Sequence, residues 1–280
     1  MIPAAAVGRG SRSRPETAEH PVAPGTTHPA ARLDVVSNAE SPAASSAAAD
    51  LRRISATLAG TDALTWVLTG DSITHGVVHT QGERTYAEHL HELIRGELGR
   101  SRDIIINSAI SGNRLSDILD DWERRVSSWR PDLVTLMIGT NDVSTTGDRP
   151  IVSPAQFAAS LREFVARVRG LGAIPVLQTP PSIDVAHAPE RARIPEFVEA
   201  VREVARTEDA ILVDQHARFS ELGGGGVPWG LMGDPFHPNA AGHASLALEL
   251  ATAFGIRPEA LRSRVLPQLE AKIAAGRLNP

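Results

Sequence analysis

The chain has 280 residues, of which 42% are apolar and 22% charged, the balance of a globular protein with one sizeable domain or two small ones. The formal charge of −5 is mild and the Lys and Arg residues are scattered, which argues against a nucleic-acid-binding protein. The sequence contains no cysteine, so disulfides, a cysteine nucleophile and thiolate metal sites are excluded.

Residues 1–50 are rich in Ala, Pro, Ser and Thr and are expected to form a disordered tail, because they lack apolar clusters that would offset the cost of ordering. The weakly apolar stretch Met1–Val7 is followed, not preceded, by Arg9, Arg12 and Arg14, which is not the order of a secretory signal. No run reaches the ~18 apolar residues of a membrane span. We therefore expect a cytoplasmic protein with no membrane span.

Within residues 51–256, short apolar runs alternate with helical patterns. The runs predict five strands, at Leu64–Thr69, Asp103–Asn107, Leu133–Ile138, Ile174–Gln178 and Ala210–Val213. The helical patterns predict helices at Ala47–Leu58, Arg84–Leu98, Leu115–Ser127, Ser153–Arg169, Ile194–Thr207 and Asn239–Phe254. This alternation favours an α/β domain, a mostly parallel sheet with helices on both faces. Residues 257–280 are expected to add a C-terminal helix, Glu259–Ala275, of unknown docking.

The polar residues with chemical potential follow the predicted strands. Gly70-Asp71-Ser72 follows the first run, Asn107 to Asn113 the second, and Gly139-Thr140-Asn141-Asp142 the third. In open α/β sheets, ligands bind outside the carboxyl ends of the strands. Gly-Asp-Ser alone is also good turn chemistry, so it needs the other loops as context.

These loops hold the parts that a serine hydrolase requires: a hydroxyl, a histidine to take its proton, a carboxylate to orient the histidine, and donors for an oxyanion. Ser72 supplies the hydroxyl and His237 is the best base, flanked by prolines just before the last helix of the domain. Asp234 precedes His237 by three residues, close enough to reach its ring. The backbone N–H groups of Ser72 and Gly112 and the amide of Asn141 are the candidate donors.

The four blocks Gly70-Asp71-Ser72, Gly112, Gly139 to Asp142 and Asp234-x-x-His237 resemble those of the SGNH hydrolases, also called GDSL esterases or lipases. The resemblance covers roughly Leu64 to Phe254. It implies a three-layer α/β/α sandwich with five parallel strands, a flavodoxin-like SGNH hydrolase fold, with no metal and no cofactor.

The resemblance also implies roles. Ser72 is then the nucleophile, His237 the base and Asp234 its orienting acid, while Ser72, Gly112 and Asn141 form the oxyanion hole. Ile73 stands where the family usually has leucine, a volume-conserving change. Ala109 stands where many relatives have glycine. The alanine would be strained if the turn needs a positive φ.

Substrate contacts are harder to assign from the sequence. Trp229 and Phe236 flank the base and can line a pocket or the core, while Arg191 and Arg193 lie in a Pro-containing loop that is either a solvated surface or a lid.

Two local patterns favour structural roles. Asp71 and Asp142 read as residues that brace their turns. His75, His79, His89 and His91 lack a carboxylate set for a metal and are interpreted as solvated or locally bonded.

The sequence predicts a serine esterase that hydrolyses a small-molecule ester through an acyl-enzyme on Ser72. A short-chain acyl or acetyl ester of a sugar or small metabolite fits the small domain. An acyltransferase using the same site is the alternative, and a catalytically silent binding module a further one. The oligomeric state cannot be read from the sequence.

Overall fold

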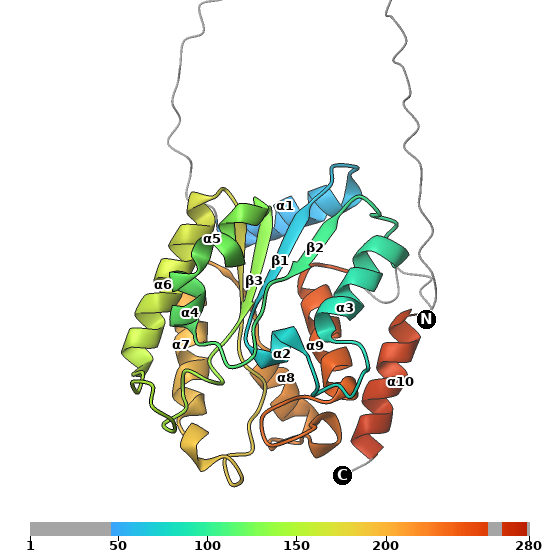
Figure 1. The fold of residues 1–280 in the computed structure, drawn as a ribbon. Helices are drawn as coiled ribbons and strands as arrows, with labels where there is room; N and C mark the ends of the chain where they lie inside the picture. Colours follow the sequence, from blue (N-terminus) through green and yellow to red (C-terminus); the bar gives the residue numbers. More distant parts are fainter. Residues whose placement is uncertain (1–45, 257–264, 279–280) are drawn as a thin grey trace, which may run out of the picture. The chain divides into compact units, whose positions relative to one another are not determined.

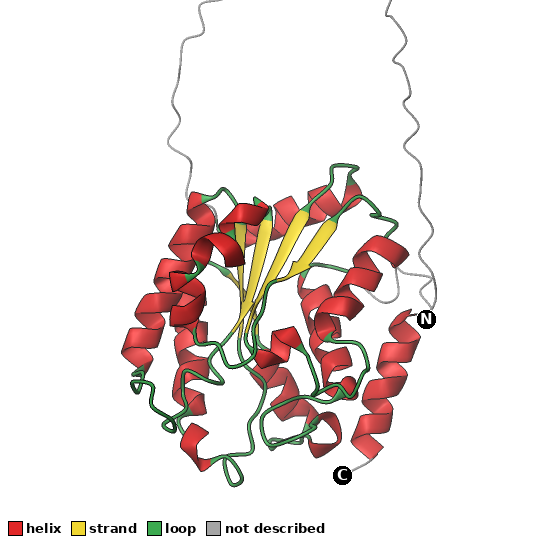
Figure 2. Ribbon diagram, in the orientation of Figure 1, coloured by secondary structure: helices red, strands yellow, loops and turns green. Residues whose placement is uncertain are grey.

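Five parallel strands form one sheet between two layers of helices (Figure 1, Figure 2). The computed structural model describes residues 46–256 and 265–278. The strands are β1 (Thr65–Gly70), β2 (Ile104–Asn107), β3 (Leu133–Met137), β4 (Ile174–Gln178) and β5 (Ile211–Val213), in the order β2-β1-β3-β4-β5. Each strand runs parallel to its neighbours, which confirms the predicted α/β fold and its five-stranded parallel sheet.

The helices of the described residues are α1 (Ala47–Ala59), α2 (Ser72–His75), α3 (Tyr86–His91), α4 (Leu115–Asp120), α5 (Trp122–Arg125), α6 (Pro154–Gly170), α7 (Ile194–Thr207), α8 (Gln215–Leu222), α9 (Ala240–Ala253) and α10 (Val265–Leu278). None of them is long and apolar enough to cross a membrane. The tail is expected over residues 1–50. Residues 1–45 and 257–264 lie outside the described residues, whereas residues 47–50 form the first turn of α1.

The two helix layers follow from the alternation of side chains along the strands. Trp66 and Leu68 of β1 pack into one buried cluster with side chains from α1, α3, α8, α9 and α10. Val67, between them, points to the other face and packs with α4, α6 and α7. Both faces of the central strands are therefore buried, as the continuous apolar runs predict.

Two expected helices are interrupted. The helical pattern Arg84–Leu98 gives α3 followed by a π-helical segment, Glu92–Glu97, which contains the poor helix former Gly96. The pattern Leu115–Ser127 breaks at Asp121, whose backbone leaves the helical region at φ −106° and ψ 32°. The helix resumes as α5 and ends in a 3₁₀ turn, Ser127–Trp129.

Two further helix predictions differ from the structure. Helix α8 is missing from the prediction; it is short, and its first turn is capped by Asp214, whose side chain accepts the Ala217 N–H. The C-terminal helix, predicted over Glu259–Ala275, continues to Leu278 as α10, and its predicted start lies outside the described residues.

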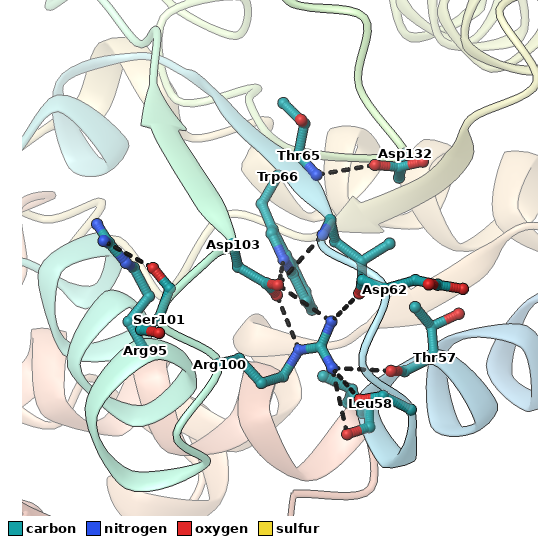
Figure 3. A network of polar contacts seen from close by, with 12 residues as sticks. Thr57, Leu58, Asp62, Thr65, Trp66, Arg95, Arg100, Ser101, Asp103 and Asp132 are labelled. Carbon is teal, nitrogen blue, oxygen red and sulfur yellow. Dashed lines mark hydrogen bonds and ion pairs between the residues drawn. The ribbon is translucent and has the colours of Figure 1, made fainter.

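A buried ion pair closes the amino-terminal end of the sheet (Figure 3). Arg100 donates two hydrogen bonds to Asp103, of 2.9 and 3.0 Å, and further ones to the carbonyl oxygens of Thr57 and Asp62 in and after α1. Asp103 also accepts the indole N–H of Trp66 at 3.0 Å. The network ties α1 to the starts of β1 and β2, at the ends of the strands away from Ser72.

The carboxyl-terminal ends of the strands hold the polar loops. In the order β2-β1-β3-β4-β5, the direction of chain progress changes between β1 and β3, and ligands in such sheets bind outside that point. Ser72 directly follows β1, and Asn141 follows β3. The fold therefore brings the predicted blocks to one edge of the sheet.

Candidate active site

The loop after β1 presents Ser72 at the start of the short helix α2. Gly70 is needed there, because a Cβ atom would lie 2.3 Å from the carbonyl oxygen of Met137 on β3. Asp71 caps α2, and its Oδ1 accepts the N–H of Ile73 at 3.0 Å. This tight packing fixes the Ser72 side chain, which is buried, at the end of β1.

Ser72, His237 and Asp234 form one hydrogen-bonded chain. Ser72 Oγ lies 2.8 Å from His237 Nε2, and His237 Nδ1 lies 2.6 Å from Asp234 Oδ2. With the ring proton on Nδ1, donated to the carboxylate, Nε2 accepts the hydroxyl proton of Ser72. This is the arrangement of nucleophile, base and orienting acid that acyl transfer requires.

The charges suit this arrangement. Burial lowers the pKa of His237 in spite of the nearby Asp234, so the imidazole is neutral at pH 7 and able to take a proton. Burial alone would raise the pKa of Asp234, but hydrogen bonds from the Phe236 backbone and the His237 ring hold it below its usual value. Asp234 therefore stays ionised beside a neutral base.

The loop that carries His237 is closed on itself at the start of α9. Met232 and Pro238 form an antiparallel bridge, and the Gly233 N–H donates to the His237 carbonyl oxygen at 2.8 Å. Asn239 caps α9 and its Nδ2 donates to the carbonyl oxygens of Gly230 and Met232. The backbone on both sides of His237 is held by these bonds, which fixes the ring position.

The loops after β2 and β3 meet beside Ser72. The Ile110 N–H donates to the Gly70 carbonyl oxygen at 3.3 Å, so the β2 loop lies against the β1 loop. Asn141 Nδ2 donates to the Asn113 carbonyl oxygen at 3.1 Å, so the β3 loop lies against the β2 loop. One N–H of the Asn141 amide is used in this way, which orients the other.

Gly112 lies between these contacts, on the exposed part of the β2 loop. Its φ is +80°, and a Cβ there would meet nothing within 4 Å, so the space beside its backbone is open. Ala109 is not among the residues with a positive φ, so the strain that a left-handed alanine would suffer does not arise. The Ala109 N–H donates a hydrogen bond to Asn107 Oδ1 at 3.1 Å.

Two buried arginines brace the β2 and β3 loops, and the motifs do not indicate either of them. Arg114 donates to the carbonyl oxygens of Asn141, at 3.1 Å, and Pro150, at 2.6 Å. Arg125 donates to Asn113 Oδ1 at 2.6 Å. Their positions could be found only from the fold, since each acts on residues in another loop.

The carboxyl groups of Asp71 and Asp142 lie beneath these loops. Asp142 Oδ1 accepts the Leu115 N–H at 2.9 Å, so its role is a brace at the start of α4. Burial raises the pKa of Asp71 to about 7 and that of Asp142 to about 6, and each has one buried oxygen without a hydrogen bond. Both are structural groups whose pKa values lie much closer to neutral pH than that of an ordinary aspartate.

Arg191 connects the His237 loop to the β3 loop. Its guanidinium lies 3.8 Å above the ring centre of Phe236, and its Nε donates to the Thr140 carbonyl oxygen at 3.1 Å. Its charge acts on Asp234 and on His237. Arg193 instead pairs with Glu196 in the first turn of α7.

The remaining side chains near the site are aromatic. The Phe236 ring lies 4.4 Å from that of His237, centre to centre. Trp229 is 44% exposed, with the edge of its ring near His187. His79, expected to be solvated or locally bonded, lies flat on His237 instead, with ring centres 3.5 Å apart. Its sequence position gives no signal of this contact.

A cleft of about 620 Å³ lies beside His79 and Gly233. Its polar lining includes Thr80, Gln81, Glu83 and Lys272, and small residues of α9 and α10 form much of the rest. Among the described residues, His79, Asp234 and His237 also lie close enough together to share an ion, with their ligand-type atoms within 4.8 Å. The hydrogen bond between Asp234 and His237 already engages two of those atoms.

Comparison with known proteins decides the family. The sequence profile of the GDSL-like Lipase/Acylhydrolase family matches residues 68–245, which contain every block described above. The chain belongs to this family. It is therefore a carboxylic ester hydrolase of the SGNH, or GDSL, type, as the motifs predict.

Individual relatives agree with this assignment. The SGNH hydrolase is 31% identical over 212 residues to an acetylxylan esterase from Geobacillus stearothermophilus, a match that covers 70% of this chain and 94% of the relative. A crystal structure of a catalytic mutant of an acetylxylan esterase from the same organism superposes with a TM-score of 0.61 at 27% identity, covering 72% of this chain and 97% of that one.

A second solved structure is similar to the same degree. An α/β hydrolase from the metagenome of Lake Arreo superposes with a TM-score of 0.60 at 29% identity, covering 70% of this chain and 98% of the other.

Proposed function

We propose that this SGNH hydrolase cleaves acetyl or other short-chain esters through an acyl-enzyme on Ser72. The observation that carries the proposal is the hydrogen-bonded chain from Ser72 Oγ through His237 to Asp234, with links of 2.8 and 2.6 Å. Ser72 Oγ attacks the ester carbonyl carbon while His237 Nε2 takes its proton. Asp234 stabilises the imidazolium that forms and keeps the ring oriented.

Hydrogen-bond donors from three loops stabilise the negative charge that develops on the carbonyl oxygen. They are the backbone N–H groups of Ser72 and Gly112 and the free N–H of the Asn141 amide. Donors held in place before the reaction stabilise the tetrahedral intermediate without a cost of reorganisation. The hydrogen bond from Asn141 to Asn113 supports this role because it fixes the plane of the amide.

The reaction is completed by two proton transfers through the same nitrogen. Protonated His237 gives its proton to the leaving alcohol as the carbon–oxygen bond of the ester breaks. A water molecule then attacks the acyl-enzyme, with His237 again as the base, and releases the carboxylic acid and free Ser72.

The alcohol that we propose is a sugar or another polar small molecule. The acetylxylan esterase relative supports an acetylated carbohydrate. The cleft beside His79 supports a polar alcohol, because Thr80, Gln81, Glu83 and Lys272 offer hydrogen-bond donors and acceptors along it. Phe236 and Arg191, packed together beside His237, are proposed to border the same substrate, and exposed Trp229 to extend its contact surface.

The test measures hydrolysis of p-nitrophenyl acetate, butyrate and octanoate, and release of acetate from an acetylated xylo-oligosaccharide. Ser72→Ala should abolish turnover on every substrate, whereas Ser101→Ala, at an exposed serine near the other end of the sheet, should leave it unchanged. Acetyl esters should be cleaved fastest. Equal rates for wild type and Ser72→Ala would overturn the mechanism, and a preference for octanoate would overturn the substrate class.

A further inference from the structure

The contact between His79 and His237 is close and well aligned. The two rings are stacked with centres 3.5 Å apart and planes only 10° from parallel. His79 Nδ1 lies 3.7 Å from Asp234 Oδ2, the oxygen that is hydrogen-bonded to His237. A second imidazole therefore covers the face of the base and borders the carboxylate that orients it.

The backbone before His79 is strained in a way that its own surroundings do not explain. Val78 has a φ of +75°, although β-branched residues avoid that region, and its side chain is 78% exposed. Backbone strain persists where the surrounding structure imposes it and is concentrated at functional sites. Here the strained residue precedes the histidine that contacts the base.

The rest of the loop is fixed from both ends. The Gln81 N–H donates to the Val78 carbonyl oxygen at 3.0 Å, closing a turn around His79. Glu83 pairs with Lys272 of α10. The carbonyl oxygen of His79 also lies only 3.4 Å from the point where Gly233 would carry a Cβ, so the loop is pressed against the loop of the base.

We infer that His79 is a positioning residue, which holds the His237 imidazole between Asp234 and Ser72. The inference rests on the proposed function. A flat neighbour prevents the His237 ring from turning out of line with both hydrogen bonds. When His237 gains a proton in the reaction, the face of a neutral aromatic ring also stabilises the resulting cation.

The experiment compares His79→Ala, which removes the ring, with His79→Phe, which keeps a flat aromatic ring that cannot be protonated. His91→Ala is the matched control, because His91 is exposed on α3 and contacts Arg95 rather than the site. Values of kcat and KM for p-nitrophenyl acetate are measured for each variant at about pH 8, above the ordinary pKa of histidine. Thermal unfolding of each variant checks that it is folded.

At about pH 8, His79→Ala should lower kcat about 10-fold with little change in KM, the size expected for an aromatic–cation contact. His79→Phe should restore kcat to within about threefold of wild type, and His91→Ala should match wild type.

Unchanged kcat in His79→Ala, or equal losses of kcat in the Ala and Phe variants, would overturn the inference. Ser72→Ala, assayed alongside, separates this from failure of the proposed function. If that variant is inactive while the His79 variants behave as wild type, only the role of His79 is wrong.

Discussion

The most demanding structural prediction concerns the buried ion pair at the amino-terminal end of the sheet. Asp103→Ala removes a carboxylate that accepts four hydrogen bonds: two from Arg100, one from the Trp66 indole and one from the Leu64 N–H. The Asp103 side chain is 1% exposed and that of Arg100 6%, so water cannot replace the lost acceptor. The guanidinium is left buried without a counter-charge.

Breaking a buried pair from one side costs about 3–5 kcal/mol. The remaining hydrogen bonds of Arg100 to the carbonyl oxygens of Thr57 and Asp62 are still present in the variant, so we expect about 4 kcal/mol within that range. That is a large part of the total stability of about 5–15 kcal/mol typical of a folded domain.

The assay is guanidinium chloride unfolding followed by circular dichroism, with the free energy of unfolding extrapolated to water. Glu196→Ala serves as the control, because it breaks the exposed pair with Arg193 and should cost under about 1 kcal/mol. Esterase turnover of folded Asp103→Ala should equal that of wild type, since the network lies away from Ser72. A loss of stability no greater than that of Glu196→Ala would refute the reasoning.

Three further predictions concern the site and its support. Asn141→Ala should lower kcat by about 10²–10³ with a smaller change in KM on p-nitrophenyl acetate, and a loss below about threefold would remove Asn141 from the oxyanion hole. Asp71→Asn should flatten the pH dependence of the free energy of unfolding. The pKa of Asp71 is about 7 in the folded protein and 3.8 ordinarily, so the wild-type free energy of unfolding falls by about 1.4 kcal/mol for each pH unit as pH rises between these values. An equal decline in the variant would contradict this. Gly242→Ala should lower the free energy of unfolding by about 1–3 kcal/mol and should also lower kcat, because the new Cβ would lie 2.2 Å from the Leu231 carbonyl oxygen in the His237 loop. Gly170→Ala is the control, because a Cβ at Gly170 meets open space.

The sheet and its helices were largely predictable because their local signals agree with the tertiary structure. Helix α6 begins where Ser153 and Gln156 form a capping box, and its interior positions recur at helical spacing. The strand β4 was predicted with its exact ends. Helix α8 was missed because it is short, and its cap, Asp214, is also bonded to Arg202 and Thr179, contacts that only the fold provides.

Three blocks of the candidate site could be predicted because they stand at strand ends, where a parallel sheet brings loops together. The fourth, Asp234 and His237, could be predicted because a carboxylate and a histidine stand three residues apart just before the last helix of the domain.

The residues that support these blocks could not be predicted from the sequence. Arg114 donates to Asn141 in the loop after the next strand, and Arg125 reaches back to Asn113 from α5, and no local sequence signal indicates either contact. His79 depends on a loop with a strained valine, and no periodicity or spacing specifies that conformation.

The central claim is that Ser72 becomes acylated with His237 as its base. The most direct measurement is labelling by a fluorophosphonate, followed by mass spectrometry of the digested protein. The account predicts one adduct per chain, on the peptide that contains Ser72, and a large loss of labelling rate in His237→Ala. Labelling at another serine, or an equal labelling rate in wild type and His237→Ala, would contradict it.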